Sequence, residues 1–276
     1  MQIGLFKNSK SPLQELMLDL SKELNFDLIT INSLEDKAIS NVDGLIVSDE
    51  FKSSADIANT LKRFKNILFL NPDVASTILT QDLSIICEEA EVELQIAGPA
   101  IHPQVFNFIA RNSSAPYYVR VIKETHSLED ISFNTLYRLL YWCAFFSEGD
   151  VRKFKMSVSP AISSEGILLY GRTESALSVP VDIWFTNLGF KDKEVVKVFT
   201  QTEVLDLDCQ TNVLMAKNKD GEAIESYEPI AHSGEVYVRS FIGHLQKKGA
   251  KPHNLALAKF LKMVEFYNSM KRSINL

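Results

Sequence analysis

Short apolar segments alternate with helix-like segments over residues 1–125 of this 276-residue chain, and this alternation restricts its fold more than any other feature. Strands separated by helices of about 10–15 residues form a parallel sheet that is covered on both faces. The sequence therefore predicts a Rossmann-like, doubly wound α/β domain over residues 1–125. The expected strands are 2–6, 27–31, 44–48, 67–70, 92–98 and 117–124, and the expected helices are about 13–24, 54–64, 75–89 and 103–111.

The pattern changes after residue 125. A long helix is predicted over 128–147, and strand-like segments follow it with turn residues but no helices between them. In 203–209, leucines alternate with Asp206 and Asp208, which is typical of a strand with one buried and one polar face. Two helices, at about 234–247 and 253–270, close the chain. We therefore expect an α+β domain with a mainly antiparallel sheet over 126–276, whose last helix is able to pack back on the first domain.

Composition and charge argue against several partners. The formal net charge is −6, whereas binding to nucleic-acid phosphates needs a basic surface. A run of about 18 apolar residues, as a membrane span requires, does not occur, and the N-terminal residues do not resemble a secretory signal. We therefore expect a cytoplasmic protein with neither a nucleic-acid nor a membrane partner.

Cysteine and histidine residues give no sign of a metal or redox site. Cys87, Cys143 and Cys209 lie far apart in apolar stretches, so we expect small core residues in a reducing compartment. The histidines show no metal-ligand spacing such as H-x-x-x-H. The sequence thus predicts no bound metal.

Four stretches together resemble the Gfo/Idh/MocA family of NAD(P)-dependent oxidoreductases, which act mostly on sugars and polyols. Their order and spacing carry the resemblance, more than any one motif. The resemblance implies a dinucleotide-binding domain followed by a dehydrogenase-type C-terminal domain, with NAD or NADP as the cofactor and a ligand crevice between them. The stretches are 41–72 (ending in LNP), 90–109 (AEVELQIAGPAIHPQVFNFI), 130–142 (DISFNTLYRLLYW) and 241–273.

The cofactor-binding positions depart from the family pattern. The turn after the first strand is usually G-x-G-x-x-G, which brings backbone N–H groups to the pyrophosphate. Here the only glycine is Gly4, which we expect inside the strand, and a ribose-binding acidic residue is replaced by asparagine. The side chains in the turn would occupy space that the pyrophosphate needs. By resemblance, the candidate cofactor-binding residues are Lys7, Asn8, Ser9, Asn32, Ser48, Asn71 and Pro72.

The positions that carry the family's chemistry have changed as well. Asn71 stands where the family's Glu-Lys-Pro loop has lysine. The peptide bond before Pro72 could be cis, as it often is in relatives. In the Asp-x-x-x-His pattern, Asp130 is retained but Asn134 replaces the histidine that acts as general acid and base, and Tyr137 replaces the next aspartate. An amide neither carries an ammonium charge nor shuttles a proton near neutral pH.

These substitutions predict a degenerate relative, a non-catalytic binding or assembly protein that binds a dinucleotide weakly or not at all. The alternative is an active NAD(P)-dependent oxidoreductase of a sugar, polyol or related small molecule. It would recruit a displaced residue, with tyrosine able to act as a proton donor if its pKa is lowered. The candidates are Lys7, Asp49, His102, Asp130 and Tyr137. A crevice that holds a different small molecule is a third hypothesis.

The resemblance also implies an assembly. Exposed antiparallel sheets in this family often pair face to face, so we expect a homodimer through the C-terminal sheet, or a heteromer with an active relative. The strands expected at this face are 154–159, 166–171 and 180–186, with the apolar residues Leu168, Tyr170, Trp184 and Phe185.

Overall fold

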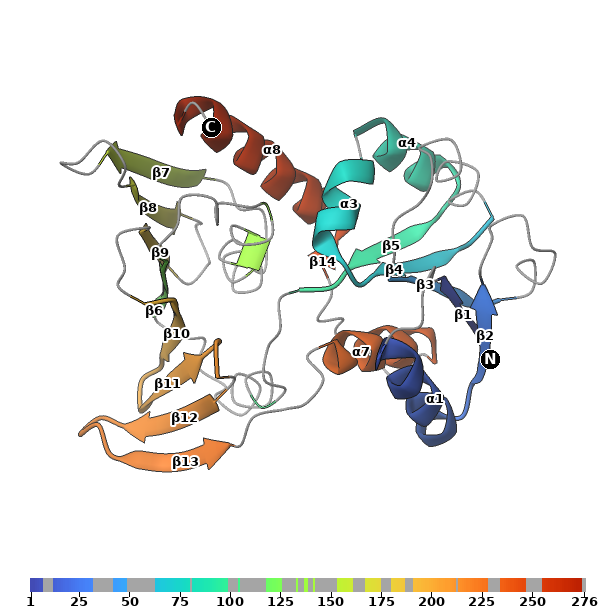
Figure 1. Ribbon diagram of the computed structural model, residues 1–276, viewed down its shortest axis with the longest axis horizontal. Coiled ribbons are helices and arrows are strands. Elements are labelled where there is room, and N and C mark those ends of the chain that lie inside the picture. Colours follow the sequence, from blue (N-terminus) through green and yellow to red (C-terminus); the bar gives the residue numbers. More distant parts are fainter. Residues whose placement is uncertain are drawn as a thin grey trace. The chain divides into compact units, whose positions relative to one another are not determined.

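The chain folds into two compact units, each made of two stretches of sequence (Figure 1). The first comprises Met1–Gly98 and Gly234–Phe266, and the second comprises Pro99–Ser233 and Tyr267–Leu276. The structure is a computed structural model, and it describes residues 1–6, 12–31, 42–48, 63–79, 81–98, 104, 118–125, 133, 137–138, 141, 153–160, 167–174, 180–186, 191–211, 213–227, 234–246 and 255–274.

The first unit is built on a parallel sheet, as predicted. Its strand order, within the described residues, is β14-β5-β4-β3-β1-β2, and only the short β14 runs antiparallel to its neighbour. The central strands are almost wholly buried, which is what a sheet covered on both faces requires. Gly4 lies inside the first strand, as expected. The strands are β1 (Gln2–Phe6), β2 (Asp27–Ile31), β3 (Gly44–Val47), β4 (Asn66–Phe69), β5 (Glu93–Ile96) and β14 (Leu255–Ala256).

Helices lie on both faces of this sheet (Figure 1). On one side are α1 (Pro12–Leu24) and α7 (Glu235–Leu245), and on the other are α3 (Pro72–Ile78) and α4 (Gln81–Glu89). The last two replace the single helix expected at 75–89, because the backbone at Leu79 is extended and ends α3. Of the helix expected at 54–64, only residues 63 and 64 are described, and they are not helical; of that expected at 103–111, only the helical Gln104 is described.

A distant part of the sequence, α7, completes this unit. A Cβ atom added at Gly44 would lie 3.0 Å from ring carbons of Phe241, so α7 rests directly on β3. Arg239 binds the carboxylate of Glu23 on α1 through both terminal nitrogens, at 2.7 and 2.6 Å. Because α7 follows the whole second unit in sequence, the first unit cannot be completed by the N-terminal residues alone.

The second unit contains a mainly antiparallel sheet, also as predicted. Its order, within the described residues, is β13-β12-β11-β10-β6-β9-β8-β7, and the β6–β9 pair alone is parallel. The last helix, α8 (Leu257–Ile274), contributes to both units. The strands are β6 (Tyr118–Glu124), β7 (Lys153–Pro160), β8 (Ile167–Glu174), β9 (Val181–Thr186), β10 (Lys193–Phe199), β11 (Glu203–Asp208), β12 (Val213–Asn218) and β13 (Ala223–Tyr227).

One strand lies in a different sheet from the one that we expected. Residues 117–124 were predicted to extend the parallel sheet, but β6 lies between β10 and β9 in the second sheet. Its burial explains the difference: Val119 and Val121 are buried whereas Arg120 is exposed. This alternation suits a sheet with one covered face, whereas a strand of the parallel sheet is apolar on both faces.

The two faces of the second sheet differ in burial. Val121, Phe185 and Leu205 lie on the inner face and are fully buried. The helical residues Phe133 and Tyr137 are buried too, and their rings stack with centroids 5.7 Å apart. The outer face carries Trp184, which is 41% exposed. No helix among the described residues is both long enough and apolar enough to cross a membrane.

Candidate functional site

The carboxyl edge of the parallel sheet is where this fold places ligands, and Ser48 and Asn71 follow β3 and β4 there. The Ser48 backbone N–H donates to the carbonyl oxygen of Phe6 at 3.2 Å, and its hydroxyl donates to the same oxygen at 3.1 Å. These bonds join the ends of β1 and β3. Ser48 therefore uses its donor hydrogen within the protein, although its hydroxyl oxygen can still accept.

Asn71 forms the N-terminal cap of α3. Its Oδ1 accepts hydrogen bonds from the backbone N–H groups of Asp73 at 3.0 Å and Val74 at 3.4 Å. Pro72 occupies the first turn, where its missing N–H is of no consequence, and the Asn71–Pro72 peptide bond is trans. A lysine has no acceptor with which to make this cap. The asparagine therefore has a structural role at the position where the resemblance places the family's lysine.

Tyr137 is fully buried in the second unit. Burial raises the pKa of its hydroxyl well above the ordinary value, and the neighbouring Tyr141 raises it further. A catalytic proton donor needs the opposite shift, toward the working pH. Tyr137 thus lies in the core, packed against Phe133, and its environment does not suit the acid–base role of the alternative hypothesis.

Several predicted site residues lie outside the described part of the chain, so their placement stays a prediction. Among the described ones, Ser48, Asn71 and Pro72 lie at one edge of the parallel sheet, and Tyr137 lies in the other unit. The residues outside the described ranges are Lys7, Asn8, Ser9, Asn32, Asp49, His102, Asp130 and Asn134.

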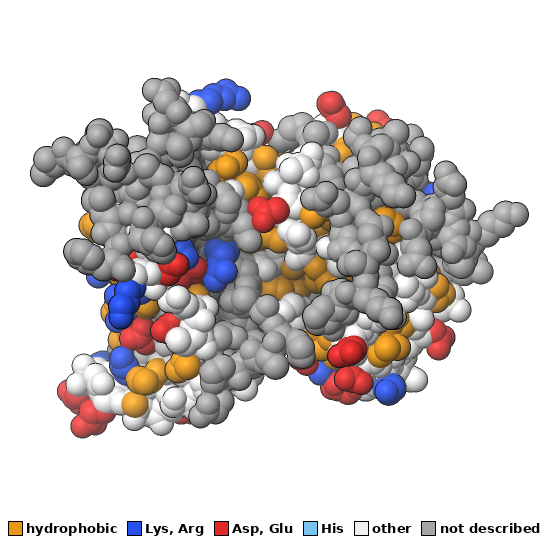
Figure 2. Space-filling model, in the orientation of Figure 1, with side chains coloured by type: hydrophobic (Ala, Val, Ile, Leu, Met, Phe, Trp, Pro, Cys, Tyr) orange, Lys and Arg blue, Asp and Glu red, His pale blue; other side chains and the backbone are white. Residues whose placement is uncertain are grey.

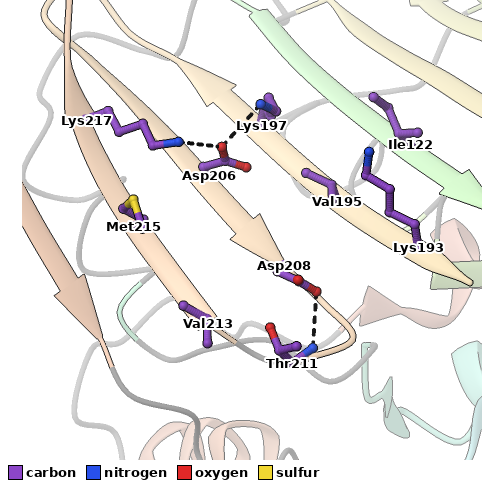
Figure 3. A pocket seen from close by; sticks show the side chains of 10 residues that line it. All are labelled: Ile122, Lys193, Val195, Lys197, Asp206, Asp208, Thr211, Val213, Met215 and Lys217. Carbon is purple, nitrogen blue, oxygen red and sulfur yellow. Dashed lines mark hydrogen bonds and ion pairs between the residues drawn. The ribbon is translucent and has the colours of Figure 1, made fainter. Parts of the chain in front are cut away.

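The outer face of the second sheet has a hollow of about 430 Å³ that the sequence did not lead us to expect (Figure 3). Its floor is apolar, with Ile122 of β6 and Val195 of β10 as cross-strand neighbours. Charged side chains stand around this floor, and Figure 2 shows basic and acidic side chains mixed over β10–β13. The lining residues are Ile122, Lys193, Val195, Lys197, Asp206, Asp208, Thr211, Val213, Met215 and Lys217.

Asp206 is the electrostatic centre of the hollow. Its Oδ2 accepts from the ammonium groups of Lys197 at 3.2 Å and Lys217 at 3.0 Å, from the two flanking strands. Burial alone would raise the pKa of Asp206, but the hydrogen bonds from Lys217 and Lys197 outweigh it, so the pKa lies below its ordinary value. Asp206 is thus a carboxylate at neutral pH, shared by two cations.

Asp208 has a different role. Its Oδ1 accepts from the backbone N–H groups of Gln210 at 2.9 Å and Thr211 at 3.1 Å, which fixes the turn after β11. The alternation of leucine and aspartate over 205–208 was a signal for one polar face, and the structure confirms it. The sequence could not tell, however, that lysines of β10 and β12 would meet this face, because that depends on strand pairing.

The described ranges contain no group of three or more His, Cys, Asp or Glu side chains placed so that they could hold a metal ion. Cys87 and Cys209 are buried free thiols, as expected of core residues. Burial raises the pKa of both thiols, which keeps them protonated and unreactive. Cys143 lies outside the described residues.

No protein-family model matches the sequence, and no curated protein matches it. Solved structures do match over almost the whole chain. UDP-N-acetylglucosamine 3-dehydrogenase GnnA from Acidithiobacillus ferrooxidans has 10% identity and a TM-score of 0.64, with 98% of this chain and 96% of that chain covered. A dehydrogenase (MviM) from Clostridium difficile has 11% identity and a TM-score of 0.68, with 99% of each chain covered.

A third match is the super-repressor mutant of Gal80p from Saccharomyces cerevisiae, with 13% identity, a TM-score of 0.61, and coverage of 99% of this chain and 95% of that chain. These neighbours are of the Gfo/Idh/MocA type. The fold that the resemblance implied is therefore confirmed.

The cap formed by Asn71 can be tested by substitution. Asn71→Ala should lower the free energy of unfolding by about 1 kcal/mol, because two backbone N–H groups lose their acceptor. Asn71→Asp retains an acceptor oxygen and should stay close to the wild type. Urea denaturation followed by circular dichroism would measure both variants. Equal stability of Asn71→Ala and the wild type would show that the cap contributes nothing.

Proposed function

We propose that the chain is a non-catalytic binding or assembly protein built on the fold of the Gfo/Idh/MocA-type oxidoreductases. The observation that carries this proposal is that the Asn71 side chain caps a helix. The resemblance places a lysine ammonium there, next to the reacting hydroxyl. This chain has an amide whose oxygen caps α3 through Asp73 and Val74, and an amide offers no proton for transfer.

Tyr137 supports the same proposal from the second unit. It stands where the resemblance places an aspartate beside the family's histidine, and it is buried among aromatic rings with a raised pKa. The histidine position itself holds Asn134 in the sequence. The side chains at the positions of the lysine, the histidine and the second aspartate therefore offer no group suited to proton transfer to and from an alcohol at neutral pH.

The fold itself does not impose hydride transfer. The same fold is found in GnnA and MviM, which are dehydrogenases, and also in Gal80p, of which the matched structure is a super-repressor mutant. A fold is a scaffold, and function depends on the residues that a particular chain places on it. A chain that keeps the scaffold and lacks the acid–base groups suits binding better than oxidation.

The proposal predicts no turnover. Purified protein should not reduce NAD or NADP with any member of a panel of sugars, polyols and nucleotide sugars, as followed by the absorbance of the reduced nicotinamide. A dehydrogenase of the same fold, with its own substrate, is the positive control. Turnover of any panel member by the wild type above the level of a buffer control would overturn the proposal in favour of an enzyme with displaced residues.

For assembly, we propose that the outer face of the second sheet pairs with a second copy. Trp184 of β9 is exposed there and pairs with Ile122 of β6 across the strands. In the next row of this face, Arg120 of β6 is the cross-strand partner of Asp182 of β9, so we place the contact on the β6–β9 part of the face, which leaves the hollow over β10–β12 open. Phe185, which we had expected at this face, is fully buried on the other side of the sheet and cannot contribute.

Trp184→Glu should convert the dimer into a monomer, because a carboxylate would be desolvated at the contact. Size-exclusion chromatography with light scattering measures the mass directly. Ile85→Glu, at a residue 54% exposed on α4 of the first unit, is the matched control and should remain dimeric. A monomeric wild type, or a Trp184→Glu variant that remains dimeric, would refute this contact.

A further inference from the structure

The hollow over β10–β12 has more cationic groups than anionic ones. Three lysines line it against two aspartates, which leaves a net charge of +1 (3 − 2). Two of these lysines, Lys197 and Lys217, share a single oxygen of Asp206. Since each ammonium has three donor hydrogens, both retain donors that Asp206 does not use.

Lys193 is the cation in excess. Its side chain is exposed, and among the described residues no carboxylate lies within ion-pairing distance of it. Glu124 is its cross-strand partner in backbone register, yet the two form no ion pair. Figure 3 shows its ammonium directed toward Ile122 and Val195, over the floor of the hollow. A positive charge held above an apolar surface is suited to an anion that carries an apolar part.

Asp208 counts toward the net charge of the hollow, but it forms no ion pair with Lys193. It lies half-buried, and one of its oxygens is engaged by two backbone N–H groups of the following turn. Asp206 is held as a carboxylate by two lysines, so it balances only one of them. The remaining positive charge is that of Lys193, beside Val195 of the same strand, in a hollow whose size is within the range of small-molecule sites, roughly 300–1,000 Å³.

From this arrangement we infer that the hollow over β10–β12 binds a small amphipathic anion, with a carboxylate or phosphate group at Lys193 and a short apolar body on the neighbouring Ile122 and Val195. The site lies within the second unit and is separate from the sheet edge that carries Ser48 and Asn71. The inference does not rest on the proposed function, because a chain with or without dehydrogenase activity could carry this hollow.

The experiment uses four probes of matched length: hexanoate, hexyl phosphate, hexanol and hexylamine. Isothermal titration calorimetry with the full chain should show saturable binding of hexanoate, of hexyl phosphate or of both, at one site per chain, and none of hexanol or hexylamine. Tighter binding of hexanoate would identify a carboxylate ligand, and tighter binding of hexyl phosphate would identify a phosphate ester.

Lys193→Gln tests the assignment within the hollow. This variant removes a charge that has no carboxylate partner in the described structure, so folding should be unaffected, and binding of the anionic probe should weaken at least about tenfold. Lys219→Gln, an exposed lysine in the β12–β13 turn outside the hollow, is the matched control and should bind as the wild type does.

Three results would overturn the inference. These are the absence of saturable binding by both anions, binding of hexanol as tight as that of hexanoate, and a Lys193→Gln variant that binds the anions as well as the wild type. Each of them leaves the nicotinamide turnover assay unaffected, so failure of this inference is distinguishable from failure of the proposed function.

Discussion

Neighbouring residues of a strand point to opposite faces of its sheet, and most of what distinguishes the second unit follows from this rule. Val119 and Val121 of β6 face the core, whereas Arg120 between them is exposed. In β9 the same alternation buries Phe185 and exposes Trp184. The outer face, with its tryptophan and its charged hollow, therefore exists because alternate residues of the same strands form the core.

The functional account depends on side chains that already have structural roles. Asn71 caps a helix, the Ser48 hydroxyl joins two strand ends, and Tyr137 fills the core. None of these groups is a free acid, base or cation at the position where the resemblance would place one. The chain thus shares the fold of the Gfo/Idh/MocA-type structures, and the described residues at these positions have structural roles.

The periodicity of the sequence was sufficient to predict both sheets and most of the helices in the described part of the chain, because strand and helix faces impose repeats that can be read locally. It failed where the outcome depended on partners distant in the chain. The place of β6 is one example, although the alternation in YVRVIKE was a local signal that pointed to the second sheet. The packing of α7 against Gly44 is another, since residues almost 200 positions apart meet there.

The candidate site was predictable only in part. The resemblance identified Asn71 as a changed position, but its role as a cap required the geometry of α3. The hollow was not predictable, because the lysines of β10 and β12 approach Asp206 only once the register of three strands is known. Long-range register is the information that a single sequence lacks.

Our prediction that this chain binds a dinucleotide weakly or not at all is tested most directly by thermal unfolding with NAD, NADH, NADP and NADPH in turn. A ligand at about 100 times its Kd stabilises a native protein by about 2.7 kcal/mol, which is visible as a rise in Tm. The account predicts no such rise with any of the four at millimolar concentration. A clear rise with one of them, comparable to that of a dehydrogenase of the same fold, would contradict it.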